Sequence, residues 1–440
     1  MSNREYVESV EHLGGYDDIE LPGLSLAVVV REEWGRLTSL LLARHRRLDL
    51  VEDALADAVE AAARTWPEGG TPDNPAAWLH TAARRRIIDR VRAESMANRK
   101  VPLLVTEAEH RQSGHGGMAD PGGLVEDDLL RLVLMCTHPA LAPEAAVALA
   151  LRLVLGVSTH DIARLFLISE PTVAARITRA KKKVVAAGIP FAVPAADVLS
   201  QRLETVAQTA YLAFTAGYAP GSGPDLLRAD LAGEAVRLMQ VVRDLRPGEP
   251  APVALLALML LQHSRRDARV GDDGRLVLLA DQDRRRWRRT DIDAGLALLA
   301  DPVLTGPITP LVASYVVQAR IAAEHASAAS PGATRWDKIV DHYDLLLGLV
   351  PSPSARLARA VAVAEASGPG AGLVALDGIE ITGSHRVDAV RAELLSRHGD
   401  ATAARAAYDA AIVACRNETE RAHLLERRQA LPPTHVATSS

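Results

Sequence analysis

Residues 156–184 read GVSTHDIARLFLISEPTVAARITRAKKKV, and this stretch predicts two helices separated by a tight turn. Ser158 and Asp161 form a variant of the capping box, which predicts the start of the first helix. Ser169 can cap the second helix, and Pro171 is tolerated in its first turn because that backbone nitrogen has no helical partner. The stretch therefore predicts a helix-turn-helix unit.

The second predicted helix carries an apolar stripe and a basic outer side. The stripe consists of residues that recur at helical spacing, namely Val173, Ile177, Ala180 and Val184. A helix of this kind fits the major groove of DNA, with its cations on phosphates. The candidate DNA contacts lie largely off the stripe: Thr172, Ala175, Arg176, Arg179, Lys181 and Lys182. A helical hairpin with a solvated basic end is the alternative, because this motif has many false positives.

An acidic helix is predicted upstream, in DLVEDALADAVEAAARTW at residues 49–66. Apolar side chains recur along its inner face, at Val51, Leu55, Val59 and Ala62. The acidic side chains expected on its outer side are Glu52, Asp53, Asp57 and Glu60. The turn-rich loop PEGGTPDNP follows at residues 67–75.

A second basic helix is predicted from Asn74 onward, in NPAAWLHTAARRRIIDRVRAE. Asn74 can cap this helix and Pro75 suits its first turn. Three apolar side chains can pack inward, those of Trp78, Ala82 and Ile87. Five arginines crowd the helix against only two acids: Arg84, Arg85, Arg86, Arg90 and Arg92. An acidic helix, a loop and a basic helix indicate two different partners, one cationic and one polyanionic.

Together these segments resemble a bacterial RNA polymerase sigma factor of the extracytoplasmic-function, sigma-70-like group. Residues 26–94 resemble sigma region 2 and residues 126–188 resemble region 4, in the family's order and separation. The resemblance implies that the loop and the basic helix open and read the −10 promoter element, through Asn74, Trp78 and the five arginines. It implies that residues 170–183 read the −35 element.

The resemblance also implies core RNA polymerase as a partner, contacted at its β′ clamp helices and its β flap. The family carries an Asp-x-x-Gln-Glu pattern on the helix that docks on the clamp helices. Asp53 matches the first acid and Asp57 keeps the charge of the last, whereas Ala56 replaces the glutamine. One polar contact of the family's interface therefore has no counterpart at residue 56.

After about residue 201 the chain continues for more than half its length and resembles the extended subfamily, whose C-terminal domain is helical and tetratricopeptide-like. One segment has tetratricopeptide spacing, with small residues that let paired helices approach, at Ala392, Leu395, Gly399, Ala404, Tyr408 and Ala411. The segment GDDGRLVLL predicts a hairpin or a loop with a short strand, because Asp273 and Gly274 are a turn signal. Internal control, or a regulatory protein bound to the extension, is a reasonable hypothesis.

Composition agrees with a helical protein that binds DNA locally. Hydrophobic residues make up 48% of the chain and aromatic residues only 3%, so the core consists mainly of Ala, Leu and Val, which suits close-packed helices. The net charge is −5, so affinity for DNA must come from local basic clusters. No phosphate loop, zinc-protease motif or serine-hydrolase elbow is present, which argues against an enzyme.

Neither a metal nor another cofactor is expected. Cys136 and Cys415 are too few for a disulfide framework, and Cys136 with His138 offers too few ligands for a metal. The start of the chain lacks a signal peptide, and the longest apolar run is too short to span a bilayer. We expect a cytoplasmic protein without a membrane contact.

We therefore predict an all-α chain with two small helical sigma domains and a large helical C-terminal domain. The predicted boundaries are 20–97 for region 2, 98–125 for a flexible linker, 126–188 for region 4, 189–200 for a second linker, 201–430 for the extension and 431–440 for a disordered tail. The predicted function is promoter-specific transcription initiation, regulated by the extension. Two alternatives remain: a stand-alone helix-turn-helix regulator with a repeat-type sensor, and a tetratricopeptide-like scaffold that binds peptides.

Overall fold

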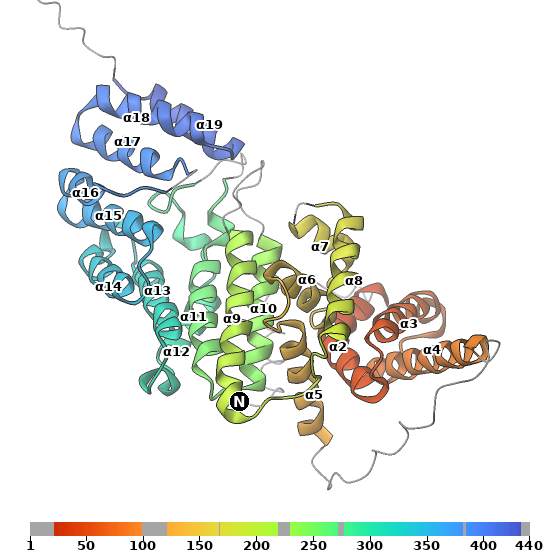
Figure 1. The fold of residues 1–440 in the computed structure, drawn as a ribbon. Helices are drawn as coiled ribbons and strands as arrows, with labels where there is room; N and C mark the ends of the chain where they lie inside the picture. Colours follow the sequence, from red (N-terminus) through yellow and green to blue (C-terminus); the bar gives the residue numbers. More distant parts are fainter. Residues whose placement is uncertain are drawn as a thin grey trace, which may run out of the picture. The chain divides into compact units, whose positions relative to one another are not determined.

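Every regular element of the computed structural model is a helix, as Figure 1 shows for the part of the chain that is described: residues 22–98, 121–166, 168–218, 229–271, 277–381 and 384–432. The all-α prediction is confirmed for these residues. The chain forms two compact units, Met1–Leu132 with Leu153–Gly156, and Val133–Arg152 with Val157–Ser440. The predicted region 2 lies in the first unit. The helix-turn-helix and the extension share the second.

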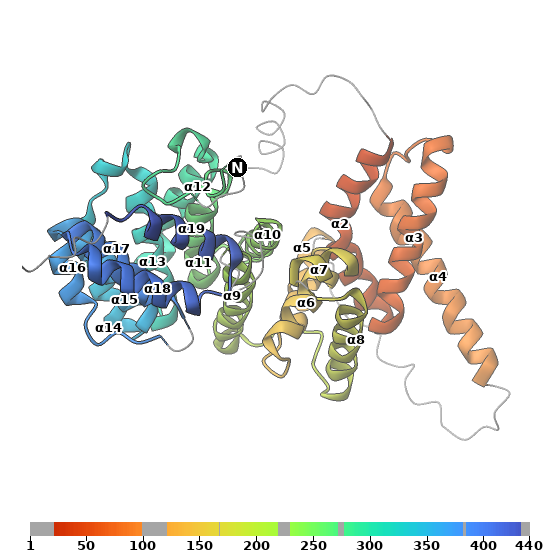
Figure 2. The same cartoon turned by 90° about the horizontal axis from the view of Figure 1, so that it is seen from above.

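The first unit contains three helices that each pack against the other two: α2 (Pro22–His45), α3 (Leu48–Gly69) and α4 (Pro75–Asn98). They lie side by side in Figure 2. On α3 the predicted inner residues Val51, Leu55 and Ala62 are fully buried, and Val59 is half-buried. The apolar stripe thus sets which side of α3 faces its neighbours.

Two glycines let α2 approach residues 153–156 closely. A side-chain carbon at Gly35 would lie 2.3 Å from the carbonyl oxygen of Val154. Gly156 has a φ of +72°, and a side-chain carbon there would lie 2.6 Å from the ring of Trp34. Only glycine fits both positions without displacing backbone or the buried tryptophan.

The second unit contains the predicted helix-turn-helix, formed by α7 (Thr159–Phe166) and α8 (Glu170–Ala186). The capping box is confirmed, because the Asp161 amide donates to Ser158 Oγ at 3.0 Å while that hydroxyl donates to the Asp161 carboxylate at 2.6 Å. The predicted stripe of α8 is buried throughout. Ser169 directly precedes α8, but its hydroxyl pairs with Thr172 Oγ1 at 2.7 Å and not with a backbone amide.

The core of the extension is built around α11 (Pro250–His263), which is buried along nearly its whole length. It packs against α9 (Ala196–Tyr218), α10 (Ala229–Leu245), α12 (Arg289–Leu299) and α13 (Pro310–Ser327). The longest apolar run of the sequence is therefore the central core helix. Among the described helices none is long and apolar enough to cross a membrane.

Beyond α13 each helix packs mainly against the next one in the chain. These helices are α14 (Trp336–Leu349), α15 (Pro353–Ser367), α16 (Pro369–Ala375), α17 (Arg386–His398), α18 (Ala401–Ala414) and α19 (Glu418–Gln429). The predicted tetratricopeptide-like unit is the hairpin of α17 and α18, where Ala392, Ala404, Tyr408 and Ala411 are buried. Gly399 ends α17 with a φ of +94°, as a C-terminal glycine cap requires.

Several predicted boundaries differ from the structure. The helix α5 (Pro121–Cys136) begins inside the predicted first linker, and α9 begins at Ala196, inside the second. Leu431, placed in the predicted tail, is buried against α17 and α18 because it caps their apolar cluster. Residues 99–120 of the first linker, residues 272–276 of the predicted hairpin and residues 433–440 of the tail lie outside the described residues.

Candidate nucleic-acid interface

The acidic and basic helices of the first unit are paired with each other. Arg90 of α4 reaches across to α3 and contacts the Asp57 carboxylate at 2.9 Å and the Asp53 carboxylate at 3.3 Å. Arg47, just before α3, likewise contacts Glu94 of α4 at 3.0 Å. The Arg90 pairs join residues that the sequence assigned to two separate partners, DNA for Arg90 and core polymerase for the two aspartates.

Glu52 does not lie on the outer side of α3, so this part of the prediction is wrong. Only 7% of the residue is exposed, because Glu52 lies one turn from the buried Leu48 and Leu55, on the same face of α3. Asp53 and Glu60 are exposed and Asp57 is half-buried. Of the four predicted acids, Asp53, Asp57 and Glu60 therefore belong to the acidic surface of α3.

The predicted basic side of α4 is exposed at its centre. Arg84, Arg85 and Arg86 face solvent, while the neighbouring Ala83 and Ile87 are buried. Arg92 is exposed as well and lies 4.0 Å from Asp89, at the limit of an ion pair. The three consecutive arginines form the most available cationic surface of this helix. Arg90, by contrast, is held by the two aspartates.

The loop between α3 and α4 is shorter than predicted and is braced by two tryptophans. Residues Pro67 to Gly69 belong to the last turn of α3, so the loop begins at Gly70. Asn74 caps α4 as predicted, because its side-chain oxygen accepts from the Ala77 amide at 2.9 Å. Buried Trp66 meets half-buried Trp78 edge to face, with ring centroids 5.6 Å apart. This contact fixes the two helix ends that the loop connects.

A hollow of about 690 Å³ lies beside Asn74, between α2 and the start of α4. Its lining includes Arg36, Arg44, His80 and Asn74. Burial and the neighbouring Arg84 and Arg44 hold the pKa of His80 below its usual range, so His80 is neutral at pH 7. The positive charge at the hollow therefore comes from Arg36 and Arg44, and Glu33, which also lines it, pairs with Arg36 at 3.4 Å.

Sequence reasoning did not identify Arg36, Arg44 or His80. The only local signal is that Arg36 and Arg44 are eight positions apart, which places them on one face of α2. The sequence pattern of α2 does not show that this face packs beside α4, which depends on the tertiary structure.

The predicted −35 residues line the outer side of α8. Thr172, Ala175, Arg179 and Lys182 are exposed, and Arg176 and Lys181 are half-buried. The Arg176 guanidinium lies over the ring of Phe166, 5.7 Å from its centroid, which restricts where this cation can point. Phe166, at the end of α7, is a positioning residue that sequence reasoning missed.

Three family models match the chain in succession. Residues 29–96 match sigma-70 region 2, residues 131–184 match sigma-70 region 4, and residues 202–302 match a family of unknown function, DUF6596. The predicted DNA-contacting residues of both basic helices fall within the sigma-70 matches.

One curated relative is similar over most of the chain. An uncharacterized protein of Rhizobium meliloti (strain 1021) is 42% identical over 387 residues, which cover 87% of this chain and 90% of that protein. Among solved structures, the crystal structure of yeast Tom70 matches 93% of this chain and 87% of its own, at 10% identity and a TM-score of 0.33. A similarity of that size adds nothing to the fold assignment.

Proposed function

We propose a mechanism of promoter recognition from the premise that this chain belongs to the sigma-70-like factors, with regions 2 and 4 followed by a C-terminal extension. Such factors are not enzymes. They bind core RNA polymerase and promoter DNA and so direct promoter-specific transcription, which places their work in the cytoplasm. The proposal assigns these tasks to particular surfaces of this chain.

The helix α8 reads the −35 duplex in the major groove. Its first turns, with Thr172, Ala175 and Arg176, meet base edges, and Arg179, Lys181 and Lys182 hold phosphates. Two features support this assignment: the buried stripe on the opposite side of α8 and the exposure of Thr172, Ala175 and Arg179.

The first unit binds the −10 element. The loop before Asn74 and the adjoining hollow accept an unstacked base, and Arg84, Arg85 and Arg86 hold the strand by its phosphates. Unstacking a base costs on the order of a few kcal/mol, so contacts elsewhere on the strand must offset it. The mixed apolar and polar lining of the hollow and the exposure of Arg84, Arg85 and Arg86 support this division of tasks.

The observation that carries the proposal is the presence of two exposed basic helices, α4 and α8, in a chain whose net charge is −5. Long-range repulsion between an acidic protein and DNA opposes binding, so the affinity must reside in these helices. Two separate basic helices also suit two separate promoter elements.

Core polymerase binds the acidic surface of Asp53, Asp57 and Glu60. When the purified chain is mixed with core enzyme, we expect it to co-elute and to support initiation, which a stand-alone regulator or a peptide scaffold would not do. Replacing both Asp53 and Asp57 with asparagine is expected to weaken core binding roughly tenfold or more, because the acidic surface loses two of its three charges. A tenfold change equals about 1.4 kcal/mol. The affinity is measured by titrating labelled protein with core enzyme.

Asparagine is chosen because a lysine at either position would face Arg90 and disturb the fold. The exposed ion pairs lost in the double variant each contribute only about 0–1 kcal/mol, so the unit stays folded. Asp89→Asn is the matched control, since its carboxylate is exposed on α4 and the charge change per site is the same. Unchanged affinity in the double variant would show that core polymerase binds another surface.

The extension regulates initiation through its contact with region 4. Arg202 of α9 donates to the carbonyl oxygen of Leu134 in α5 at 2.7 Å, and burial lowers the pKa of this arginine. A hydrogen bond from a half-buried cation to the end of a helix ties the two elements together. The contact is a route by which the extension can influence region 4.

Arg202→Ala is expected to change transcription initiation by roughly fivefold or more, because coupling free energies between sites are typically about 1–3 kcal/mol. A fall means that the extension supports initiation, and a rise means that it restrains region 4. Gln201→Ala, an exposed neighbour on α9, serves as the control, and melting curves check that each variant is folded. Initiation at the wild-type level by a folded Arg202→Ala protein would remove this contact from the regulatory mechanism.

A further inference from the structure

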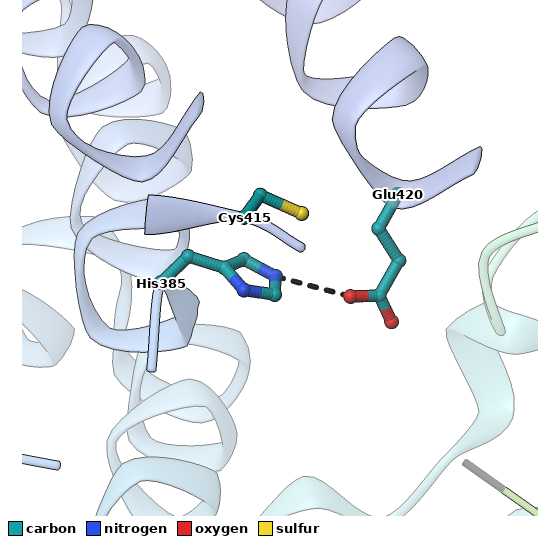
Figure 3. A group of neighbouring side chains, drawn as sticks. All are labelled: His385, Cys415 and Glu420. Atoms are coloured by element: carbon teal, nitrogen blue, oxygen red, sulfur yellow. Dashed lines mark ion pairs between the residues drawn. The ribbon is translucent and has the colours of Figure 1, made fainter. Parts of the chain in front are cut away.

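Three side chains with metal-binding chemistry meet where three helices of the extension end or begin. His385 directly precedes α17, Cys415 directly follows α18, and Glu420 lies in the first turn of α19. Figure 3 shows the imidazole of His385 turned toward the carboxylate of Glu420, with the thiol of Cys415 beside the same ring. The ligand atoms of the three residues all lie within 4.8 Å of one another.

The distances leave only a small movement to a coordinated arrangement. His385 Nε2 is already 3.1 Å from the nearer Glu420 carboxylate oxygen. Tetrahedral zinc with bonds of about 2.0–2.3 Å holds its ligand atoms roughly 3.3–3.8 Å apart. The Cys415 sulfur lies no more than 4.8 Å from the other two ligand atoms, so it must approach by up to about 1 Å to enter this range.

An ordinary ion pair between His385 and Glu420 is the simpler account, and Arg386 adds a second contact to Glu420 at 3.9 Å. Without metal, Cys415 belongs to the apolar cluster of the last helices and its thiol donates to the Asn417 carbonyl oxygen at 3.4 Å, so metal binding would have to replace this weak hydrogen bond. The chain has only two cysteines, and this one is buried beside both an imidazole and a carboxylate from other helices. The donor set of nitrogen, sulfur and oxygen is one that zinc and similar transition metals accept.

The cluster also borders open space. His385 and Glu420, together with Arg386 and Arg416, line a hollow of about 560 Å³. A metal held by three protein ligands keeps one coordination position for water or a small ligand, and the hollow leaves room for it.

We propose that His385, Cys415 and Glu420 bind one divalent transition-metal ion of the zinc class, with its fourth position open to the adjoining hollow. Because the ligands come from the junctions of α17, α18 and α19, the ion ties the last helices of the extension together. Metal bound to the folded state alone stabilises it by mass action.

The test uses the full-length protein, stripped with a chelator and titrated with zinc and with cobalt as a spectroscopic probe. We expect one ion per chain, a rise in the melting temperature and a thiolate-to-cobalt charge-transfer band. Cys415→Ser is expected to abolish the band. His385→Gln and Glu420→Gln are each expected to weaken binding by more than roughly 100-fold, because even lost outer partners cost about 10–100-fold.

Two variants serve as controls. Cys136→Ser removes the other, fully buried cysteine and must keep the band, and Arg386→Ala removes a neighbouring cation that is no ligand and must keep binding as well. Melting curves recorded in chelator show whether each protein is folded. If a variant does not fold, the titration of the wild-type protein still tests whether the chain binds one metal ion. The absence of stoichiometric binding by wild type, or a band that survives Cys415→Ser, would overturn the proposal.

Discussion

Replacing Arg84, Arg85 and Arg86 together with alanine is expected to lower the affinity for single-stranded −10 DNA by about 10²–10³-fold at 0.1 M salt. On a single strand each phosphate contact contributes a salt-dependence slope of about 0.7, and at 0.1 M this corresponds to about fivefold per contact. The slope of log affinity against log salt is therefore expected to fall by roughly two. The measurement is a fluorescence titration with a labelled oligonucleotide at several salt concentrations.

The fold is expected to survive, because all three side chains are exposed while the buried Ala83 and Ile87 are untouched. Arg64→Ala is the control, since Arg64 is an exposed arginine on α3 and contacts only Glu60 among the ion pairs described. It should change the affinity little. A triple variant with the wild-type salt slope would show that the arginine triplet does not touch the strand.

Replacing Arg176 and Arg179 singly with alanine is expected to weaken promoter binding by about 1–3 kcal/mol for each residue that reads a base. Because Arg176 is assigned to base edges and Arg179 to phosphates, the Arg176 variant should lose roughly 5–150-fold and show a weaker sequence preference. A residue that contacts only phosphate would instead lower affinity evenly across sequences and reduce the salt slope by about one. Binding to matched and mutated −35 duplexes separates these outcomes.

Phe166→Leu provides a sharper version of the same test. The ring of Phe166 lies under the Arg176 guanidinium, so its loss should reduce sequence preference while total positive charge stays constant. Lys183→Ala, at the far end of α8, is the control and should affect only non-specific binding. If none of the arginine substitutions altered binding, α8 would not occupy the major groove.

Local features of the fold were predictable from the sequence. The capping box at Ser158, the cap at Asn74 and the buried stripe from Val173 to Val184 are confirmed. Each depends on residues three or four positions apart, whose geometry an α-helix sets by itself. The hairpin around Gly399 and Tyr408 was predictable for the same reason, since its small residues sit at regular intervals.

The sites themselves were predictable only in part. The exposed residues on α8 follow from helix periodicity, but the position of Arg176 over Phe166 depends on how α7 meets α8. Glu52 was misplaced because the apolar stripe of α3 is wider than its four predicted residues. A wider stripe reflects contact with two neighbouring helices, and a pattern on one helix does not reveal how many neighbours it has.

The sequence by itself predicted a helical chain, the starts of α4, α7 and α8, and two helices with a basic side. Tertiary structure alone decided that Arg90 pairs with Asp53 and Asp57, over separations of 37 and 33 residues. It also brought Arg44 and His80 to one hollow, and His385, Cys415 and Glu420 to one cluster. Helix periodicity is a local property of neighbouring residues, whereas these contacts depend on the angles and distances at which separate helices cross.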